Sequence, residues 1–413
     1  MTLSRLPFVR MRSARQARVH AIILAVIMWI FAIAVGTIGT GDRGVAGPLK
    51  GADFVQFYAL GHLAHDHQIE AMYDMQALHD AQTALVPASA DDLYPAVYPP
   101  QIAALFAPVS GWSYQGALLL WTLLSIAGYV LIVWSAWRPV SHVLSDRPLV
   151  IAAAAAFPPF WSLVLHGQIT VLVLAAFWLG WLALERGQRL LAGAAFGLLA
   201  IKPQFGIPLA MVVLIGREWP MLAGALASVV AQVAAASWVL GLEAFRLFVN
   251  ATWSITLNNV DALEAKPFLS HSLRTLTRLA PNWIGVPLWA AAAAVVLWYT
   301  ARVWRSDAPL RVRLGVVVLA SVLVNPHLII YDATVLALPL LWFGAYMHES
   351  ERRAAAAPFW ITVYWLFAAL LAPTAAAIGV QLSVVLMMVL IVLMSRAVAR
   401  ASVHPRIAAD AAA

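Results

Sequence analysis

Long apolar runs separated by short polar turns make up most of this chain. The runs are continuous and do not alternate with polar residues, which favours membrane-spanning helices over strands. We expect an all-α, polytopic membrane protein that forms a single domain over residues 1–413. The pattern predicts about 12 spans, near residues 20–38, 114–137, 149–165, 168–184, 190–202, 203–216, 219–241, 283–304, 311–324, 327–346, 357–373 and 376–395.

Two of the apolar segments are atypical. Residues 99–110 are apolar but short and bounded by prolines, so we expect a re-entrant or interfacial segment there. Residues 190–202 and 203–216 are also short, and Lys202-Pro203 stands between them. Irregular backbone at membrane depth is tolerated where it is buried in protein or lines a cavity. The pair is therefore predicted to form broken helices beside a cavity.

Composition supports the membrane interpretation. The chain is 63% hydrophobic and 11% charged, beyond what a soluble domain can bury. The formal charge of +7 comes from basic residues scattered between the runs, so it indicates orientation and not nucleic-acid binding. There is no cysteine, which excludes disulfides and thiolate metal sites.

Arginine placement gives the expected orientation. Arg5, Arg10, Arg12, Arg15 and Arg18 precede the first run, which we interpret as a retained span and not a cleaved signal peptide. By the positive-inside rule, both termini are predicted to be cytoplasmic in the plasma (inner) membrane. The longer polar segments, 39–113 and 242–282, then form two outer loops. Function is expected on this extracytoplasmic or periplasmic face.

Four polar clusters share the predicted outer face. Ionisable groups near membrane depth are expensive and often mark functional sites. The clusters are Asp53 with Tyr58, His166 with Gln168, Lys202 with Gln204, and Asn325 with His327 and Asp332.

The candidate chemistry starts from Asp53, the acid just beyond the first span. A carboxylate there can act as a general base on an acceptor hydroxyl, and it can equally be a solvated loop acid. Lys202 suits a phosphate, or it snorkels to the interface. His327 suits proton transfer, or it caps a helix.

Arg274 and Arg278 stand four residues apart in the second outer loop. At helical spacing they suit a lipid phosphate, and a plain surface role fits as well. His62, His65, His67 and His79 do not share one helical face, so an amphipathic segment explains them better than a metal site. No Walker motif, dinucleotide turn or nucleophile elbow occurs.

Several short motifs, in order, resemble family 87 glycosyltransferases. The motifs are Asp53-Phe54, Tyr58-Ala59-Leu60-Gly61, Met72-Tyr73-Asp74, Tyr98-Pro99-Pro100, Phe106-Ala107-Pro108, His166-Gly167-Gln168, Ala192-Gly193, Ile201-Lys202-Pro203 and Asn325-Pro326-His327. They extend over roughly residues 50–345. The resemblance implies a GT-C membrane fold with an outward active site and a polyprenyl-phosphate sugar donor, mannose above all.

The resemblance also implies site residues. Asp53 corresponds to the catalytic base, and His327 to a second active-site group. It implies an enzyme that needs neither metal nor cofactor. We therefore expect an inverting hexosyltransferase that acts on an extracytoplasmic lipid or glycan acceptor.

In this interpretation the remaining polar residues bind the substrates. Lys202, with Arg274 or Arg278, holds the departing phosphate, whereas Tyr58 and Gln168 bind sugar hydroxyls. One alternative is a transporter or flippase of lipid-linked sugars, which needs the same cavity but no base. Another is a membrane acyltransferase built on His327 and Asp332, which leaves Asp53 without a purpose.

Overall fold

The structure, a computed structural model, contains helices joined by turns and loops, and no strand, in the residues that it describes. These are residues 14–44, 47–92, 94–95, 97–258, 269–349, 353–371 and 374–410. Within them the β-type pairings are two isolated bridges, Arg43 with Leu49 and Ser270 with Ile329. The arginines at positions 5, 10, 12 and 352 and part of the second outer loop, 259–268, lie outside the described residues.

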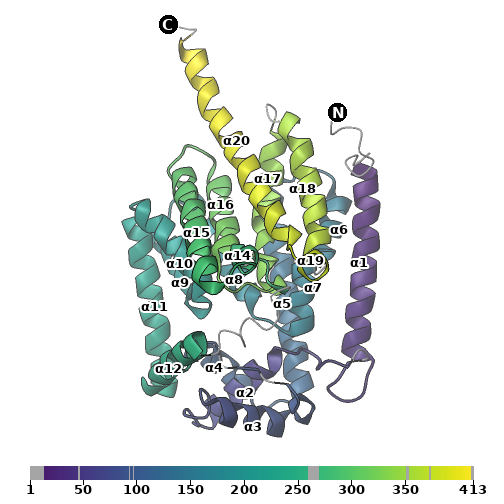
Figure 1. Cartoon of the computed structure of the whole chain (residues 1–413), viewed down its shortest axis with the longest axis vertical. Coiled ribbons are helices and arrows are strands. Elements are labelled where there is room, and N and C mark those ends of the chain that lie inside the picture. Colours follow the sequence, from purple (N-terminus) through teal and green to yellow (C-terminus); the bar gives the residue numbers. More distant parts are fainter. Residues whose placement is uncertain are drawn as a thin grey trace.

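Most helices run along the long axis of the molecule and form one bundle (Figure 1). They are α1 (Ala14–Thr37), α5 (Tyr114–Trp137), α6 (Arg147–Ala155), α7 (Pro158–His166), α8 (Thr170–Glu185), α9 (Arg189–Gly197), α10 (Pro203–Ile215), α11 (Trp219–Leu240), α15 (Asn282–Trp304), α16 (Leu310–Val324), α17 (Ala337–His348), α18 (Arg353–Leu371) and α20 (Leu382–Asp410). Short helices lie between them: α14 (Leu273–Thr277), α19 (Thr374–Ile378), η5 (Arg138–Val140), η6 (Leu198–Ile201) and η8 (Ile330–Leu336).

A layer of short helices covers one end of this bundle (Figure 1). It contains α2 (Phe54–His65), α3 (Met75–Leu85), η3 (Pro87–Ser89), α4 (Pro100–Phe106), η4 (Ala107–Val109) and α12 (Glu243–Asn258). The first predicted outer loop and α12 of the second therefore lie at the same end of the molecule, whereas α14 of the second loop packs against α15 (Figure 1). The described part of the chain begins with α1 and ends with α20 at the opposite end (Figure 1).

Among the described residues, six helices are long and apolar enough to cross a membrane. They are Arg15–Thr37, Tyr114–Val140, Trp219–Leu240, Asn282–Trp304, Ile330–His348 and Leu382–Ala399. The bent pair α6 and α7 makes a seventh if it is one span. The protein is thus a helical membrane protein, but the predicted count of about 12 spans is not confirmed.

Three predicted spans have a different local form. Residues 149–165 bend by 40° between α6 and α7, because Pro158 and Pro159 begin a new helix. The predicted span 327–346 starts with the 3-10 helix η8. The predicted span 376–395 begins instead at Leu382, after the separate short helix α19. The break at Lys202 lies where the sequence predicts it, between η6 and α10.

The bundle is held by close packing of aliphatic and aromatic side chains on α16, α17, α8 and α10. Helices α9 and α11 pack closely against each other. A Cβ on Gly193 would stand 2.0 Å from the carbonyl oxygen of Met221, and one on Gly224 equally close to that of Leu190. The missing side chains let the two backbones touch, as small residues do in membrane helix pairs.

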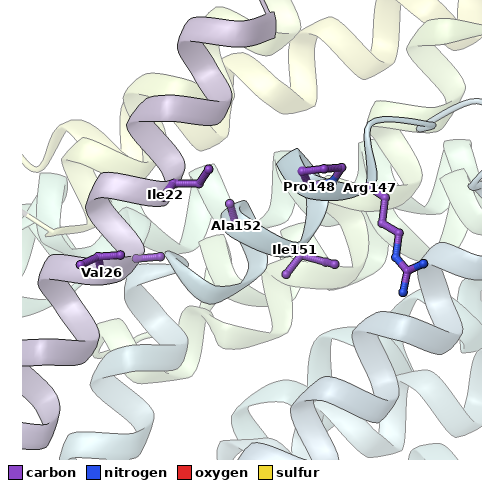
Figure 2. Close-up of a pocket in the computed structure, with 7 residues that line it drawn as sticks. Ile22, Val26, Arg147, Pro148, Ile151 and Ala152 are labelled. Carbon is purple, nitrogen blue, oxygen red and sulfur yellow. The ribbon is translucent and has the colours of Figure 1, made fainter.

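Helix α1 packs against α6 and leaves an open groove with a volume of about 570 Å³ (Figure 2). Its walls are Ile22, Ala25, Val26, Arg147, Pro148, Ile151 and Ala152. The Arg147 side chain extends away from the apolar residues (Figure 2), and its guanidinium lies 5.3 Å from the ring centroid of Trp134. The groove lacks acids and hydroxyls, so it is not the candidate catalytic site.

Candidate functional site

Asp53 occupies the position just before α2, where the outer layer meets the bundle. It is half-buried and makes no side-chain hydrogen bond to the start of its own helix. Asp74, by contrast, caps α3 by accepting from the backbone N–H of Ala77 at 2.8 Å. An aspartate before a helix usually serves as such a cap. The Asp53 carboxylate therefore has a different use.

That use is a hydrogen bond from Gln168, in the turn between α7 and α8. The Nε2 atom of Gln168 donates to Oδ2 of Asp53 at 2.7 Å. Gly167 ends α7 in the left-handed region, with φ of 61°, and a Cβ there would stand 2.7 Å from the Cβ of Phe54. Only glycine lets this turn approach α2 so closely. The His-Gly-Gln motif thus brings Gln168 to Asp53.

Lys202 lies at the break before α10 and is only 2% exposed. Its Nζ atom donates to Oδ1 of Asp332 at 2.6 Å. It also contacts Oγ1 of Thr170 at 3.1 Å and Oε1 of Gln168 at 3.3 Å. The Thr170 hydroxyl in turn donates to Oδ1 of Asp332 at 2.6 Å. A buried charge is tolerated when it is paired and hydrogen-bonded, and this one is both.

Two tyrosines flank this ion pair. The ring centroids of Tyr98 and Tyr331 lie 5.5 and 5.3 Å from the Nζ atom of Lys202, in cation–π range. The Tyr98 hydroxyl donates to Oε1 of Gln168 at 3.0 Å. Burial raises the pKa of Tyr98, against an opposing effect of Lys202, so its hydroxyl stays a donor. The Tyr331 side chain also lies near the Asp53 carboxylate.

The second outer loop packs beside the Asn325–Ile329 loop. Ser270 pairs with Ile329 in a β-bridge, and the backbone N–H of His271 donates to the carbonyl oxygen of Leu328 at 2.8 Å. Three residues after His271, α14 carries Arg274, which donates from Nη2 to Oδ1 of Asn282 at 2.7 Å. This pairing places the arginine-bearing segment next to the loop that carries His327.

His271 anchors this segment to the start of α20. Its Nδ1 atom lies 2.7 Å from Oγ of Ser383 and 3.0 Å from Nε2 of Gln381. Since an amide nitrogen only donates, Nδ1 accepts, which requires a neutral nitrogen there. Burial lowers the pKa of His271 from 6.5 to about 3. The ring therefore stays neutral in the folded protein at neutral pH.

The fold should lose stability in acid because of His271. Below pH 6.5 this histidine is protonated in the unfolded chain but stays neutral in the folded chain, because its pKa there is about 3. Stability is then complete above pH 6.5 and falls as the pH drops from 6.5 toward 3, by roughly 2 kcal/mol at pH 5. The unfolding temperature in detergent should fall more between pH 7.5 and 5 for wild type than for His271→Gln.

The exposed His65 supplies the matched control for this measurement. His65→Gln should keep the wild-type pH dependence, because the substitution is exposed and leaves the buried His271 unchanged. Equal pH responses of the two variants would show that His271 does not cause the acid sensitivity.

The structure brings three of the predicted site residues together: Asp53, Gln168 and Lys202. Tyr58 lies apart from them, because its hydroxyl donates to the carbonyl oxygen of Trp112 at 2.7 Å and its ring is 5% exposed. Arg274 and Arg278 belong to the second outer loop, and His327 belongs to the Asn325–Ile329 loop beside it. The backbone N–H of His327 donates to Oδ1 of Asn325 at 2.9 Å.

Sequence reasoning gave no role in the site to Tyr98, Thr170 and Tyr331, and linked Asp332 with His327. In the structure, Asp332 accepts from Lys202 and Thr170. One signal was available, since an acid and a lysine in apolar segments need partners of opposite charge. The Tyr98-Pro99-Pro100 motif was the other signal. Among the described residues, no group of three or more histidines and acids is placed to hold a metal ion.

The site therefore consists of a half-buried carboxylate held by an amide, with a neutralised ion pair behind it. A carboxylate accepts through two oxygens, and Gln168 uses Oδ2, so acceptor capacity remains for a hydroxyl group. Such an arrangement can remove a proton from an alcohol as the alcohol attacks an electrophile.

Comparison with known families gives the class of reaction. No curated protein and no solved structure matches the chain. The family model described as glycosyltransferase family 87 matches residues 96–326, more than half of the chain. The match contains Tyr98, Gln168, Lys202 and both loop arginines. His327 and Asp332 lie just beyond its end, and Asp53 lies well before its start. The chain belongs to glycosyltransferase family 87.

Proposed function

We propose that this protein transfers a sugar, mannose in the first instance, from a polyprenyl-phosphate donor to an extracytoplasmic lipid or glycan acceptor. In this reaction the acceptor oxygen attacks the anomeric carbon from the face opposite the phosphate. The bond between the anomeric carbon and the phosphate oxygen breaks, and the configuration inverts. Asp53 takes the proton of the acceptor hydroxyl, and polyprenyl phosphate leaves.

The observation that carries this proposal is the setting of Asp53. The carboxylate is half-buried, does not cap its helix, and is held by Gln168. It lies where the outer layer meets the bundle, and in this proposal a donor from the bilayer and an acceptor from outside meet at this position. General-base catalysis requires a carboxylate that is oriented in this way.

The leaving phosphate needs positive charge. The charge of Lys202 is already neutralised by Asp332, so the proposal gives this role to Arg274 or Arg278. Guanidinium groups suit phosphate oxygens, and they act most strongly where water is excluded. Arg274 is 5% exposed and lies on the segment that pairs with the loop of His327. His327 would then position or protonate the departing phosphate.

The helices of the first outer loop and α12 of the second form one layer at the end of the bundle away from both described termini (Figure 1). Cytoplasmic termini in the plasma (inner) membrane would put this layer on the periplasmic or extracytoplasmic side, where the proposed acceptor is. A lipid-linked donor reaches such a site from the bilayer. Such a donor requires no nucleotide-binding domain, which agrees with the lack of a Walker motif and a dinucleotide turn in the sequence.

A transfer assay tests the proposal directly. The purified protein in lipid receives radiolabelled polyprenyl-phosphate mannose and a total lipid extract, with and without a chelator. Polyprenyl-phosphate glucose and arabinose serve as competing donors. Label that moves from mannose donor to a new lipid, with or without chelator, would support the proposed reaction.

The other outcomes show whether the proposed sugar or the proposed reaction type is wrong. Transfer from the glucose or arabinose donor, without transfer from the mannose donor, would exclude mannose but leave the proposed mechanism in place. Donor that crosses the bilayer of a vesicle without reaching any acceptor would favour the transporter alternative. Family membership favours the transferase over the transporter alternative.

A further inference from the structure

The side-chain amide of Gln168 is fixed in one orientation. Three donors point at its oxygen: the Tyr98 hydroxyl at 3.0 Å, the Lys202 ammonium at 3.3 Å and the backbone N–H of Ile169 at 3.3 Å. Turning the amide over would set its NH₂ group against these donors. The amide nitrogen must therefore face the other way, toward Asp53.

Lys202 is itself held in place from behind. Asp332 and Thr170 come from different elements, η8 and α8, and both contact the lysine ammonium. Thr170 also donates to the same carboxylate oxygen that Lys202 contacts. The ammonium is 2% exposed and paired, so it is poorly placed to bind a phosphate from solvent. What it does contact on the side of Asp53 is the Gln168 oxygen.

These contacts form one chain of interactions from Asp332 through Lys202 and Gln168 to Asp53. We propose that Gln168, locked by Lys202 and Tyr98, is a positioning residue that aims the Asp53 carboxylate at the acceptor hydroxyl. The inference rests on the proposed function. It replaces the expected sugar contact of Gln168 and the expected phosphate contact of Lys202 with one shared task.

The task has a physical reason. An aspartate carboxylate can rotate about its Cβ–Cγ bond. A general base that is displaced by about an ångström from the reacting proton loses much of its contribution to the reaction rate. The Gln168 bond fixes Oδ2, which sets where Oδ1 lies. Because Gln168 is only 1% exposed, water does not replace it as the partner on this side.

The first experiment separates turnover from binding. With the purified protein in lipid, kcat is measured together with the Kd of labelled polyprenyl-phosphate mannose. Gln168→Leu should lower kcat about 10- to 100-fold and leave the donor Kd within about twofold. Tyr98→Phe, which keeps the ring and removes one donor from Gln168, should show the same pattern with a smaller loss.

The chain offers a matched control. Gln115 donates from Nε2 to Oδ1 of Asp42 at 3.0 Å, in the same kind of amide-to-carboxylate bond, but at an exposed position. Gln115→Leu should leave both kcat and Kd unchanged. A loss in this control equal to that of Gln168→Leu would overturn the inference.

Lys202 is tested with the ion pair removed as a whole, since Lys202→Met alone leaves Asp332 charged and buried. The double variant Lys202→Met/Asp332→Leu is assayed for binding of polyprenyl phosphate without a sugar. Unchanged Kd with reduced kcat in the transfer assay supports the positioning role. A Kd raised tenfold or more would return Lys202 to the phosphate and overturn the inference.

The outcomes for Gln168 are equally distinct. Full kcat in Gln168→Leu, or a weakened donor Kd with kcat retained, overturns the inference while wild-type transfer upholds the proposed function. A wild-type protein that transfers no sugar overturns the proposed function and this inference with it.

Discussion

Asp53→Asn should lower the turnover of sugar transfer about 10²- to 10⁴-fold, the usual contribution of a general base. Donor affinity should stay unchanged, because the substitution removes the proton acceptor and not a phosphate contact. Asparagine has nearly the same shape and keeps an oxygen that accepts from Nε2 of Gln168. The loss would therefore report the missing base and not a collapsed site. Single-turnover kinetics with labelled donor, alongside donor Kd, measure it.

Asp91 provides the control in the same outer loop. Its side chain is 92% exposed and lies 3.6 Å from the Arg43 guanidinium. Asp91→Asn removes a carboxylate at the surface and should leave turnover within about twofold of wild type, since exposed pairs of this kind contribute little. Comparable activity of wild type and Asp53→Asn would exclude Asp53 as the base, whatever the control does.

The sequence predicted the features that arise locally. Apolar runs predicted α5, α11 and α15 nearly to the residue, and they predicted the end of α1, which begins at Ala14, before the predicted start at residue 20. The break at Lys202 was predictable because Pro203 lacks an N–H for helix bonding and a lysine interrupts the run. The gathering of polar residues on one face was predictable from arginine placement. It led to Asp53, Gln168 and Lys202, which the structure brings together.

Other features depend on contacts between distant residues. Gln168 and Asp53 are 115 positions apart, and Lys202 and Asp332 are 130 apart. The sequence around one residue of such a pair does not show which distant residue it contacts. The sequence alone therefore predicts that Lys202 is free to bind a phosphate, whereas in the structure it is paired with Asp332. The apolar pattern also continues across the break between α19 and α20, so the predicted span 376–395 includes this break. There Gly379 has φ of 72°, and the Thr374 hydroxyl accepts from the backbone N–H of Leu382.

Asp332→Asn should cost about 3 to 5 kcal/mol of stability, the range for removing one partner of a buried ion pair. The Lys202 ammonium would stay buried beside neutral groups only: Thr170, Gln168 and two tyrosine rings. The unfolding temperature in detergent should fall sharply. Lys202→Met/Asp332→Leu should recover much of it, because this variant buries no charge at all.

The ion pair of Arg189 and Glu218 tests whether burial of the charge causes the loss of stability expected for Asp332→Asn. It has a similar distance, 2.7 Å, but the Arg189 side chain is 60% exposed. Glu218→Gln should cost less than about 1 kcal/mol, because water solvates the arginine that remains. If Glu218→Gln and Asp332→Asn lowered the unfolding temperature alike, burial would not explain the effect. If the double variant were as unstable as Asp332→Asn, the unpaired lysine would not be its source. Recovery of stability without recovery of turnover is the expected combination, since the network behind Asp53 would then serve catalysis more than folding.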